Sequence, residues 1–197
     1  YSTVSDIAKM SQYMINKYPE FYHLFSETEF EWSGIAQKNR NPLLYKDIGA
    51  DGLKTGYLSI SGYGLAASAK NDNRRLIVVG HGFTSPQKRS QGTARLLNWG
   101  FREYTNIKLY GKASDVGFLP LTMASEDKVS LTTDKDIVIT VAKAKKDAIE
   151  TEIIPIDNLK APFKKGDVIA MLKVTIPKAT PQYLSLIHIS EPTRPYW

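Results

Sequence analysis

The chain has 197 residues, of which 42% are hydrophobic and 23% are charged. This composition is typical of a globular protein, and the length accommodates one large domain or two small ones. The formal net charge of +6 comes from lysines and arginines that are spread along the chain and form no basic run. That distribution argues against a nucleic-acid-binding surface.

The sequence contains no cysteine, which excludes a disulfide framework, a thiol nucleophile and a thiolate metal site. The three histidines, His23, His81 and His188, lie far apart with no paired spacing, which argues against a metal site. No stretch approaches the roughly 18 apolar residues of a membrane span, and no signal sequence is present at the start. The chain begins with Tyr1 and not with methionine, as expected of a fragment of a longer protein.

The first predicted element is a helix. Residues 3–6, "TVSD", have capping-box spacing, and apolar residues then recur at helical intervals up to Pro19. The next segment, "FSETEFEWSGIAQKNRNPLL", alternates at Phe30 and Trp32 before Asn-Arg-Asn-Pro. This pattern predicts one strand followed by an irregular loop.

Three strands are predicted next, over residues 52–58, 62–70 and 74–80, as an antiparallel hairpin series. The serine and proline at 85–86 supply an N-cap and a first helical residue. Apolar residues at helical spacing continue this second helix to Tyr104.

From about Thr105 the sequence changes to short β-rich segments separated by polar or glycine turns. We expect a first domain over residues 1–104 and a second, a small all-β sandwich or barrel, over 105–180. The final "SLIHISEPTRPYW", residues 185–197, continues neither a β nor a helical pattern. It resembles translated sequencing-adapter read-through and is interpreted as a non-native tail. The expected β segments are "FLPLTMA", "KVSLTT", "DIVITVAKA", "ETEIIPI" and "DVIAMLKVTI".

The most informative short motif is Lys54-Thr55-Gly56, in "DGLKTGY". A K-T-G triplet is common by chance and is compatible with a lysine at a strand edge in an ordinary α/β domain. Its functional interpretation is that of the penicillin-recognising serine enzymes, in which a K-T-G strand faces an S-x-x-K nucleophile helix across a cleft. Two antiparallel strands and a helix follow the triplet, which is the order of the second half of those enzymes' fold.

Six segments, in their order, resemble landmarks of the low-molecular-mass D-alanyl-D-alanine carboxypeptidases. The β-rich segment with "APFKKGDVIAMLKV" is similar to that family's C-terminal domain. The resemblance covers about residues 1–180. It implies the C-terminal portion of an α/β (α+β) serine transpeptidase or β-lactamase-like domain, followed by a small β sandwich. The six segments are "YSTVSDIAKMSQYMI", "QKNRNPLL", "GADGLKTGY", "SGYGLAASAK", "RRLIVVG" and "ARLLNWGF".

The resemblance implies a serine that attacks the penultimate D-alanine carbonyl of a peptidoglycan stem peptide and forms an acyl-enzyme. Lys54 would face the nucleophile, Thr55 would bind the substrate's terminal carboxylate, and Gly56 would keep the wall clear of a side chain. The backbone N–H of Tyr57 would be one of two oxyanion donors. Some members of the family carry histidine at the position of Tyr57, but the role implied here uses only the backbone N–H.

Two arginines match the family's pair at the carboxylate end of the cleft. They are Arg40 in "NRNPLL" and Arg89 in "SPQKRS". The planar guanidinium suits a free C-terminal carboxylate because it can make two charge-assisted hydrogen bonds. The alternative for each is an ordinary solvated surface arginine.

The serine motifs of the family are missing. No S-x-N triplet occurs, and the only S-x-x-K matches, Ser85 to Lys88 and Ser125 to Lys128, follow the K-T-G strand. We interpret both as chance matches. The nucleophile, its general-base lysine and the second serine are therefore expected on an upstream segment, and this polypeptide is expected to be inactive by itself.

Two other functions share the motif: a β-lactamase, which normally ends at the last helix, and a non-catalytic cell-wall binding protein of the same fold. The resemblance implies peptidoglycan stem peptides and β-lactam antibiotics as partners, and neither a metal nor an organic cofactor. It also implies a location at the periplasmic face of the cytoplasmic membrane. Membrane association would use a C-terminal anchor that is not part of this sequence.

Overall fold

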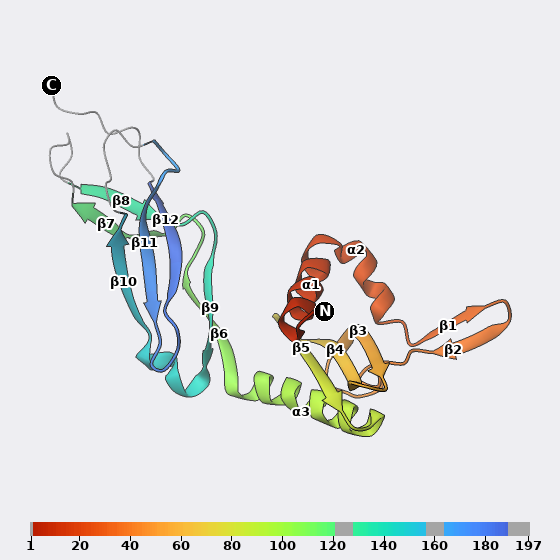
Figure 1. The fold of residues 1–197 in the computed structure, drawn as a ribbon. Helices are drawn as coiled ribbons and strands as arrows, with labels where there is room; N and C mark the ends of the chain where they lie inside the picture. Colours follow the sequence, from red (N-terminus) through yellow and green to blue (C-terminus); the bar gives the residue numbers. More distant parts are fainter. Residues whose placement is uncertain (1, 121–127, 157–163, 189–197) are drawn as a thin grey trace. The chain divides into compact units, whose positions relative to one another are not determined.

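The computed structural model describes residues 2–120, 128–156 and 164–188. The chain divides into two compact units, residues 1–103 and 104–197 (Figure 1). Each unit has a hydrophobic core of its own.

The first unit begins with helix α1, Val4–Lys17. The Asp6 N–H donates to Thr3 Oγ1 at 3.1 Å, and the Thr3 N–H donates to the Asp6 carboxylate at 2.8 Å. This reciprocal capping box confirms the predicted start of the helix. A proline then stops α1 and opens the short helix α2, Pro19–Tyr22, because it cannot continue the preceding hydrogen-bond ladder. A 3-10 turn, η1, follows at His23–Phe25.

Strands β1, Glu29–Trp32, and β2, Ile35–Lys38, form an antiparallel hairpin that extends from the body of the unit (Figure 1). The predicted strand and the irregular loop from Asn39 onward are confirmed, but the prediction missed β2, which lies between them. Ser33 and Gly34 have φ values of 52° and 76°, the pair of left-handed conformations that a two-residue hairpin turn requires. The serine-glycine dipeptide was the local turn signal for the second strand.

An antiparallel sheet in the order β3-β4-β5 forms the centre of the first unit. Its register places Thr55 opposite Leu65 and Gly56 opposite Gly64. The three predicted strands are confirmed, with a few residues added at their ends. Because β4 lies in the middle, β3 is an edge strand and carries the K-T-G triplet along that edge. The strands are β3, Ala50–Leu58, β4, Gly62–Asn71, and β5, Arg74–Phe83.

Helix α3, Pro86–Glu103, covers one face of this sheet, and α1 lies against the other (Figure 1). The Lys88 N–H donates to Ser85 Oγ at 3.1 Å, which confirms the predicted N-cap. The helix ends one residue earlier than expected, since Tyr104 already begins the next strand. The core under α3 consists of Leu43, Leu65, Ala67, Ala69 and Leu97.

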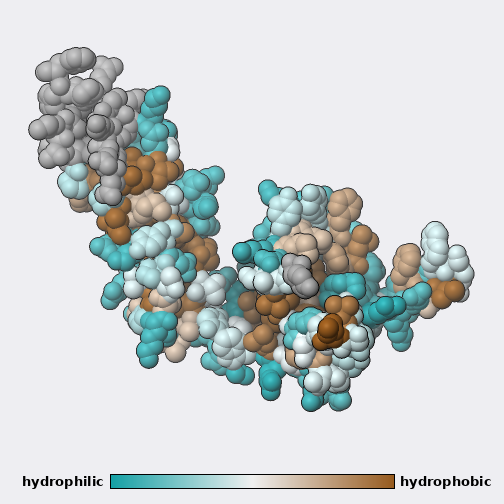
Figure 2. All heavy atoms as spheres, viewed as in Figure 1, coloured by the Kyte–Doolittle hydropathy of each residue, from teal (hydrophilic) through white to brown (hydrophobic). Residues whose placement is uncertain are grey.

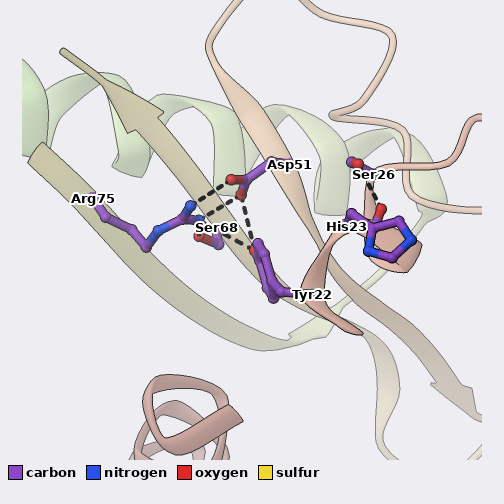
Figure 3. Close-up of polar contacts among 6 residues, drawn as sticks. All are labelled: Tyr22, His23, Ser26, Asp51, Ser68 and Arg75. Atoms are coloured by element: carbon purple, nitrogen blue, oxygen red, sulfur yellow. Dashed lines mark hydrogen bonds and ion pairs between the residues drawn. The ribbon is translucent and has the colours of Figure 1, made fainter. Parts of the chain in front are cut away.

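A polar cluster fastens α2 to the sheet (Figure 3). The Tyr22 hydroxyl donates to Asp51 at 2.9 Å, and Arg75 forms an ion pair with Asp51 at 2.7 Å. Arg75 also donates to the Ser68 hydroxyl at 2.6 Å. A Cβ at Gly52 would lie 2.6 Å from the Tyr22 hydroxyl oxygen, so only glycine leaves room for the tyrosine. Because these polar groups satisfy one another, the cluster determines where α2 sits against β3.

The second unit is a β sandwich of a five-stranded sheet, in the order β10-β11-β12-β8-β7, and a two-stranded sheet of β6 and β9. Leu131, Ile139 and Leu172, from three different strands, are each at most 1% exposed and belong to one core. The predicted sandwich is thereby confirmed. Its strands are β6, Tyr104–Tyr110, β7, Asp115–Pro120, β8, Lys128–Thr132, β9, Ile137–Ala142, β10, Glu150–Pro155, β11, Val168–Thr175, and β12, Gln182–His188, with a 3-10 helix η2 at Lys143–Ala148.

Two strands of this unit lie outside the expected β segments, namely β6 and β12. The prediction that residues 185–197 continue no β pattern is wrong for 185–188, which end β12, the middle strand of the larger sheet. Leu186 and His188 are fully buried there, because alternate residues of "LSLIH" face the core while β11 and β8 pair with the backbone. Residues 189–197 lie outside the described part of the chain, as do residues 121–127, which include the end of "FLPLTMA".

The Tyr22 cluster predicts a measurable alkaline loss of stability. Burial raises the pKa of Tyr22 from 10.0 to about 12, so the folded protein favours the neutral phenol. The resulting stabilisation is complete below pH 10.0 and is lost as the pH rises towards about 12. Tyr22→Phe cannot ionise and is expected to lose less stability across this range, although it starts roughly 1 kcal/mol less stable at neutral pH. Urea unfolding at successive pH values measures the difference.

The matched control is Tyr13→Phe, at an exposed tyrosine of α1. This variant is expected to lose stability with pH as the unsubstituted protein does. An identical alkaline loss in Tyr22→Phe would contradict the assigned role of the Tyr22 hydroxyl.

Candidate functional site

The K-T-G triplet lies at the open edge of β3. Lys54 and Gly56 are exposed, and Thr55 is half-buried. The Lys54 ammonium donates to the Thr55 carbonyl at 2.7 Å and therefore stays at the strand surface. A Cβ at Gly56 would meet no atom within 4 Å, so the space beside this residue is open. Alternate backbone groups of an edge strand face away from the sheet and are free to pair with a ligand.

Two hollows adjoin the triplet, and Lys54 and Thr55 line both of them. The larger, of about 680 Å³, is mostly apolar and lies between α1 and the sheet. Figure 2 shows hydrophobic side chains gathered in this part of the first unit. The smaller hollow, of about 290 Å³, is more polar. Its other lining residues are Gln37, Asn39, Arg40 and Leu53.

Arg40 reaches the smaller hollow from the segment that follows β2. The neighbouring Asn39 holds this segment in place: its amide donates to the Glu27 carbonyl at 2.8 Å, and its Oδ1 accepts the Asn41 N–H at 2.9 Å. These bonds close the base of the β1–β2 hairpin, and Arg40 and Lys54 line the same hollow. Its part in recognising a substrate carboxylate stays a prediction.

Arg89 approaches the triplet from the first turns of α3. Its side chain is buried, with only 9% of the residue exposed, and Nη1 donates to the Gly56 carbonyl at 3.4 Å. Its guanidinium carbon lies 5.7 Å from the centroid of the Tyr63 ring. Within the described ranges no carboxylate forms an ion pair with Arg89, and its Nε is buried without a hydrogen-bond partner. A buried cation in this state favours an anionic ligand.

One of the two S-x-x-K matches, Ser85 to Lys88, lies in the part of the chain that the structure describes. Ser85 caps α3 by accepting the Lys88 N–H. Ser125 lies outside the described residues, and its partner Lys128 begins β8 in the second unit. The serine of the first match therefore caps a helix, which agrees with its interpretation as a chance match.

The described residues contain no group of three or more histidine, cysteine, aspartate or glutamate side chains placed to hold a metal ion. The histidines are scattered: His23 contacts the Glu20 carbonyl, His81 lines the larger hollow, and His188 is buried in the second unit. No helix within residues 2–120, 128–156 and 164–188 is long and apolar enough to cross a membrane.

Sequence reasoning missed two residues that shape the site, Asn39 and Tyr63. Tyr63 lies directly opposite Tyr57 in the β3–β4 register, and the two rings are 4.3 Å apart between centroids. The signal for this pair was present in the sequence, since the short turn between the two predicted strands already determines which residues face each other. The contact with Arg89 had no such signal.

Known proteins match both units. A family profile described as D-alanyl-D-alanine carboxypeptidase matches residues 1–84, and a profile of the C-terminal domain of penicillin-binding protein 5 matches residues 104–190. The D-alanyl-D-alanine carboxypeptidase DacD of Salmonella typhimurium is 35% identical over 165 residues, which are 83% of this chain and 42% of that protein. DacA of Escherichia coli, with the same description, is 31% identical over 193 residues, 97% of this chain and 48% of that protein.

A solved structure agrees with these relatives. Penicillin binding protein 5 from Haemophilus influenzae superposes with a TM-score of 0.87 at 31% identity, over 98% of this chain and 57% of that one. The chain spans about half the length of the curated relatives that it matches. The profile matches on both units, the relatives and the superposition all point to one family, in agreement with the K-T-G edge strand. The chain therefore belongs to the D-alanyl-D-alanine carboxypeptidase family.

Proposed function

We propose that the intact protein is a serine-type D-alanyl-D-alanine carboxypeptidase that removes the terminal D-alanine from peptidoglycan stem peptides. The observation that carries the proposal is an exposed K-T-G edge strand with two arginine side chains beside it, in a chain of this family. An edge strand suits an extended peptide, and the arginines suit its free carboxylate.

Substrate binding then divides among the residues of the triplet and the arginines. The stem peptide lies along the open edge of β3, and its terminal carboxylate accepts hydrogen bonds from the Thr55 hydroxyl and from Arg40 and Arg89. The planar guanidinium groups distinguish a free carboxylate from an internal amide because only the carboxylate is charged.

Catalysis uses groups on both sides of the cleft. A serine from the upstream part of the intact protein forms an ester with the penultimate D-alanine carbonyl, and its proton passes through a lysine base to the nitrogen of the departing D-alanine. Water then hydrolyses the ester. In this chain Lys54 supplies positive charge beside the reacting carbonyl, and the Tyr57 N–H is one of the donors to the oxyanion of the tetrahedral intermediate.

The same site would bind β-lactam antibiotics, which also carry a carboxylate and acylate the serine. Because peptidoglycan lies outside the cytoplasmic membrane, the protein would act at the periplasmic face. A β-lactamase is not favoured, because the second unit matches the C-terminal domain of penicillin-binding protein 5. A non-catalytic cell-wall binding protein of the same fold is the remaining alternative.

The chain of residues 1–197 alone is expected to form no covalent adduct with a fluorescent penicillin, because no S-x-x-K motif precedes its K-T-G triplet. Fluorescence on a denaturing gel measures this, with the intact protein as the positive control. A labelled band that disappears in Ser85→Ala would place a nucleophile in this chain and contradict the expectation.

The intact protein, obtained by recovering the coding sequence upstream of Tyr1, is expected to release D-alanine from a stem pentapeptide. Lys54→Ala is expected to lower kcat/KM roughly 100-fold because it removes charge stabilisation in the transition state. Arg89→Ala is expected to lower it roughly 10-fold to 100-fold through the lost carboxylate contact. A coupled assay for free D-alanine measures both, and Lys88→Ala, at an exposed lysine on the same helix, is the control.

Rapid turnover of penicillin without release of D-alanine would instead support a β-lactamase. Absence of both penicillin labelling and D-alanine release would support the non-catalytic binding protein.

A further inference from the structure

The guanidinium of Arg89 is buried beside β3 and makes few polar contacts there. The hydrogen bond from its Nη1 to the Gly56 carbonyl is long, at 3.4 Å, and its Nε has no partner. A guanidinium with so few polar contacts needs another constraint if it is to stay in one position, because the arginine side chain has many rotamers. Among the described residues, Arg89 also contacts the face of the Tyr63 ring, with 5.7 Å between the guanidinium carbon and the ring centroid.

Tyr63 is itself supported by an aromatic ring on the neighbouring strand. It is half-buried in β4, directly opposite Tyr57 in β3, and the two ring centroids are 4.3 Å apart with an angle of 34° between the planes. Aromatic pairs across neighbouring strands stabilise each other and restrict ring rotation. The Tyr57 ring, which is 57% exposed, thus supports Tyr63 from the side nearer the K-T-G triplet.

An aromatic ring face and a carboxylate interact with a guanidinium in different ways. The aromatic face attracts the cation through its quadrupole and provides no oxygen acceptor. The N–H donors of the guanidinium are therefore left for oxygen acceptors such as a carboxylate. The ring can orient the cation without competing with the substrate for its hydrogen bonds.

We propose that Tyr63, supported by Tyr57, is a positioning residue that holds the Arg89 guanidinium at the Gly56 carbonyl, where it receives the free carboxylate of the substrate. This inference rests on the proposed carboxypeptidase function and assigns Tyr63 a part in its specificity. It also gives the Tyr57 side chain a role beyond that of its backbone N–H.

The test uses the intact protein and a stem pentapeptide. Tyr63→Leu removes the ring and is expected to raise KM about tenfold with kcat within about twofold, since a desolvated cation–π contact has that magnitude. Tyr63→Phe keeps the ring and is expected to restore KM to within about twofold of the unsubstituted value. Tyr13→Leu removes one ring of the Tyr13–Tyr18 pair on the first helix and serves as the matched control. A folding defect would lower the amount of active enzyme and not change KM.

Two further comparisons separate positioning from packing. In an Arg89→Ala background, Tyr63→Leu is expected to add less than about twofold, because residues that act through one another are not additive. On a pentapeptide whose terminal carboxylate is replaced by an amide, Tyr63→Leu is expected to change KM by less than about twofold. A role in packing alone would affect both substrates and both backgrounds equally.

The outcomes for the function and for the inference are distinct. Release of D-alanine by the unsubstituted protein supports the function. If that release is present but KM is unchanged in Tyr63→Leu, or rises equally for the amide, the positioning role is overturned and the function stands. If the unsubstituted protein releases no D-alanine, the function and the inference fall together.

Discussion

The antiparallel pairing of β3 with β4 is the constraint on which the candidate site depends. It places Gly56 opposite Gly64 and Tyr57 opposite Tyr63, and it leaves the other edge of β3 open. A slip of one residue would move each side chain of β3 to the opposite face of the sheet. Lys54 would then leave the side on which it now lies, and the two tyrosine rings would separate. The register thus determines both the exposed edge and the aromatic pair beside it.

The approach of α3 to the sheet depends on a second constraint, at the Phe83 ring. A Cβ at Gly92 would lie 2.7 Å from this ring, and a Cβ at Gly80 would lie 2.8 Å from it. A glycine inside a helix costs about 1 kcal/mol relative to alanine. Here the two glycines make room for an aromatic ring between the helix and β5. The first turns of α3, which carry Arg89, can therefore reach the edge of the sheet.

The second unit shows where local patterns mislead. Residues 185–188 were interpreted as part of a non-native tail because the segment 185–197 continues neither a β nor a helical pattern and resembles adapter read-through. The structure buries His188 completely and uses this segment to join β11 to β8. Whether a segment joins a sheet depends on which backbone lies on either side of it. The sequence of a short strand does not show which strands will pair with it. The hairpin of β1 and β2 differs, since its Ser-Gly turn is a local signal.

The sequence by itself determined the helix caps, the three central strands, the β-rich second half and the identity of the K-T-G triplet. These features are local, because they depend on periodicity, on capping residues and on short turns between neighbouring segments. Only the tertiary structure decided that Arg89 meets Gly56 and Tyr63, and that Arg40 shares a hollow with Lys54. Those contacts join residues that are far apart in the chain, and they exist because α3 packs on the sheet and the hairpin base closes around Asn39.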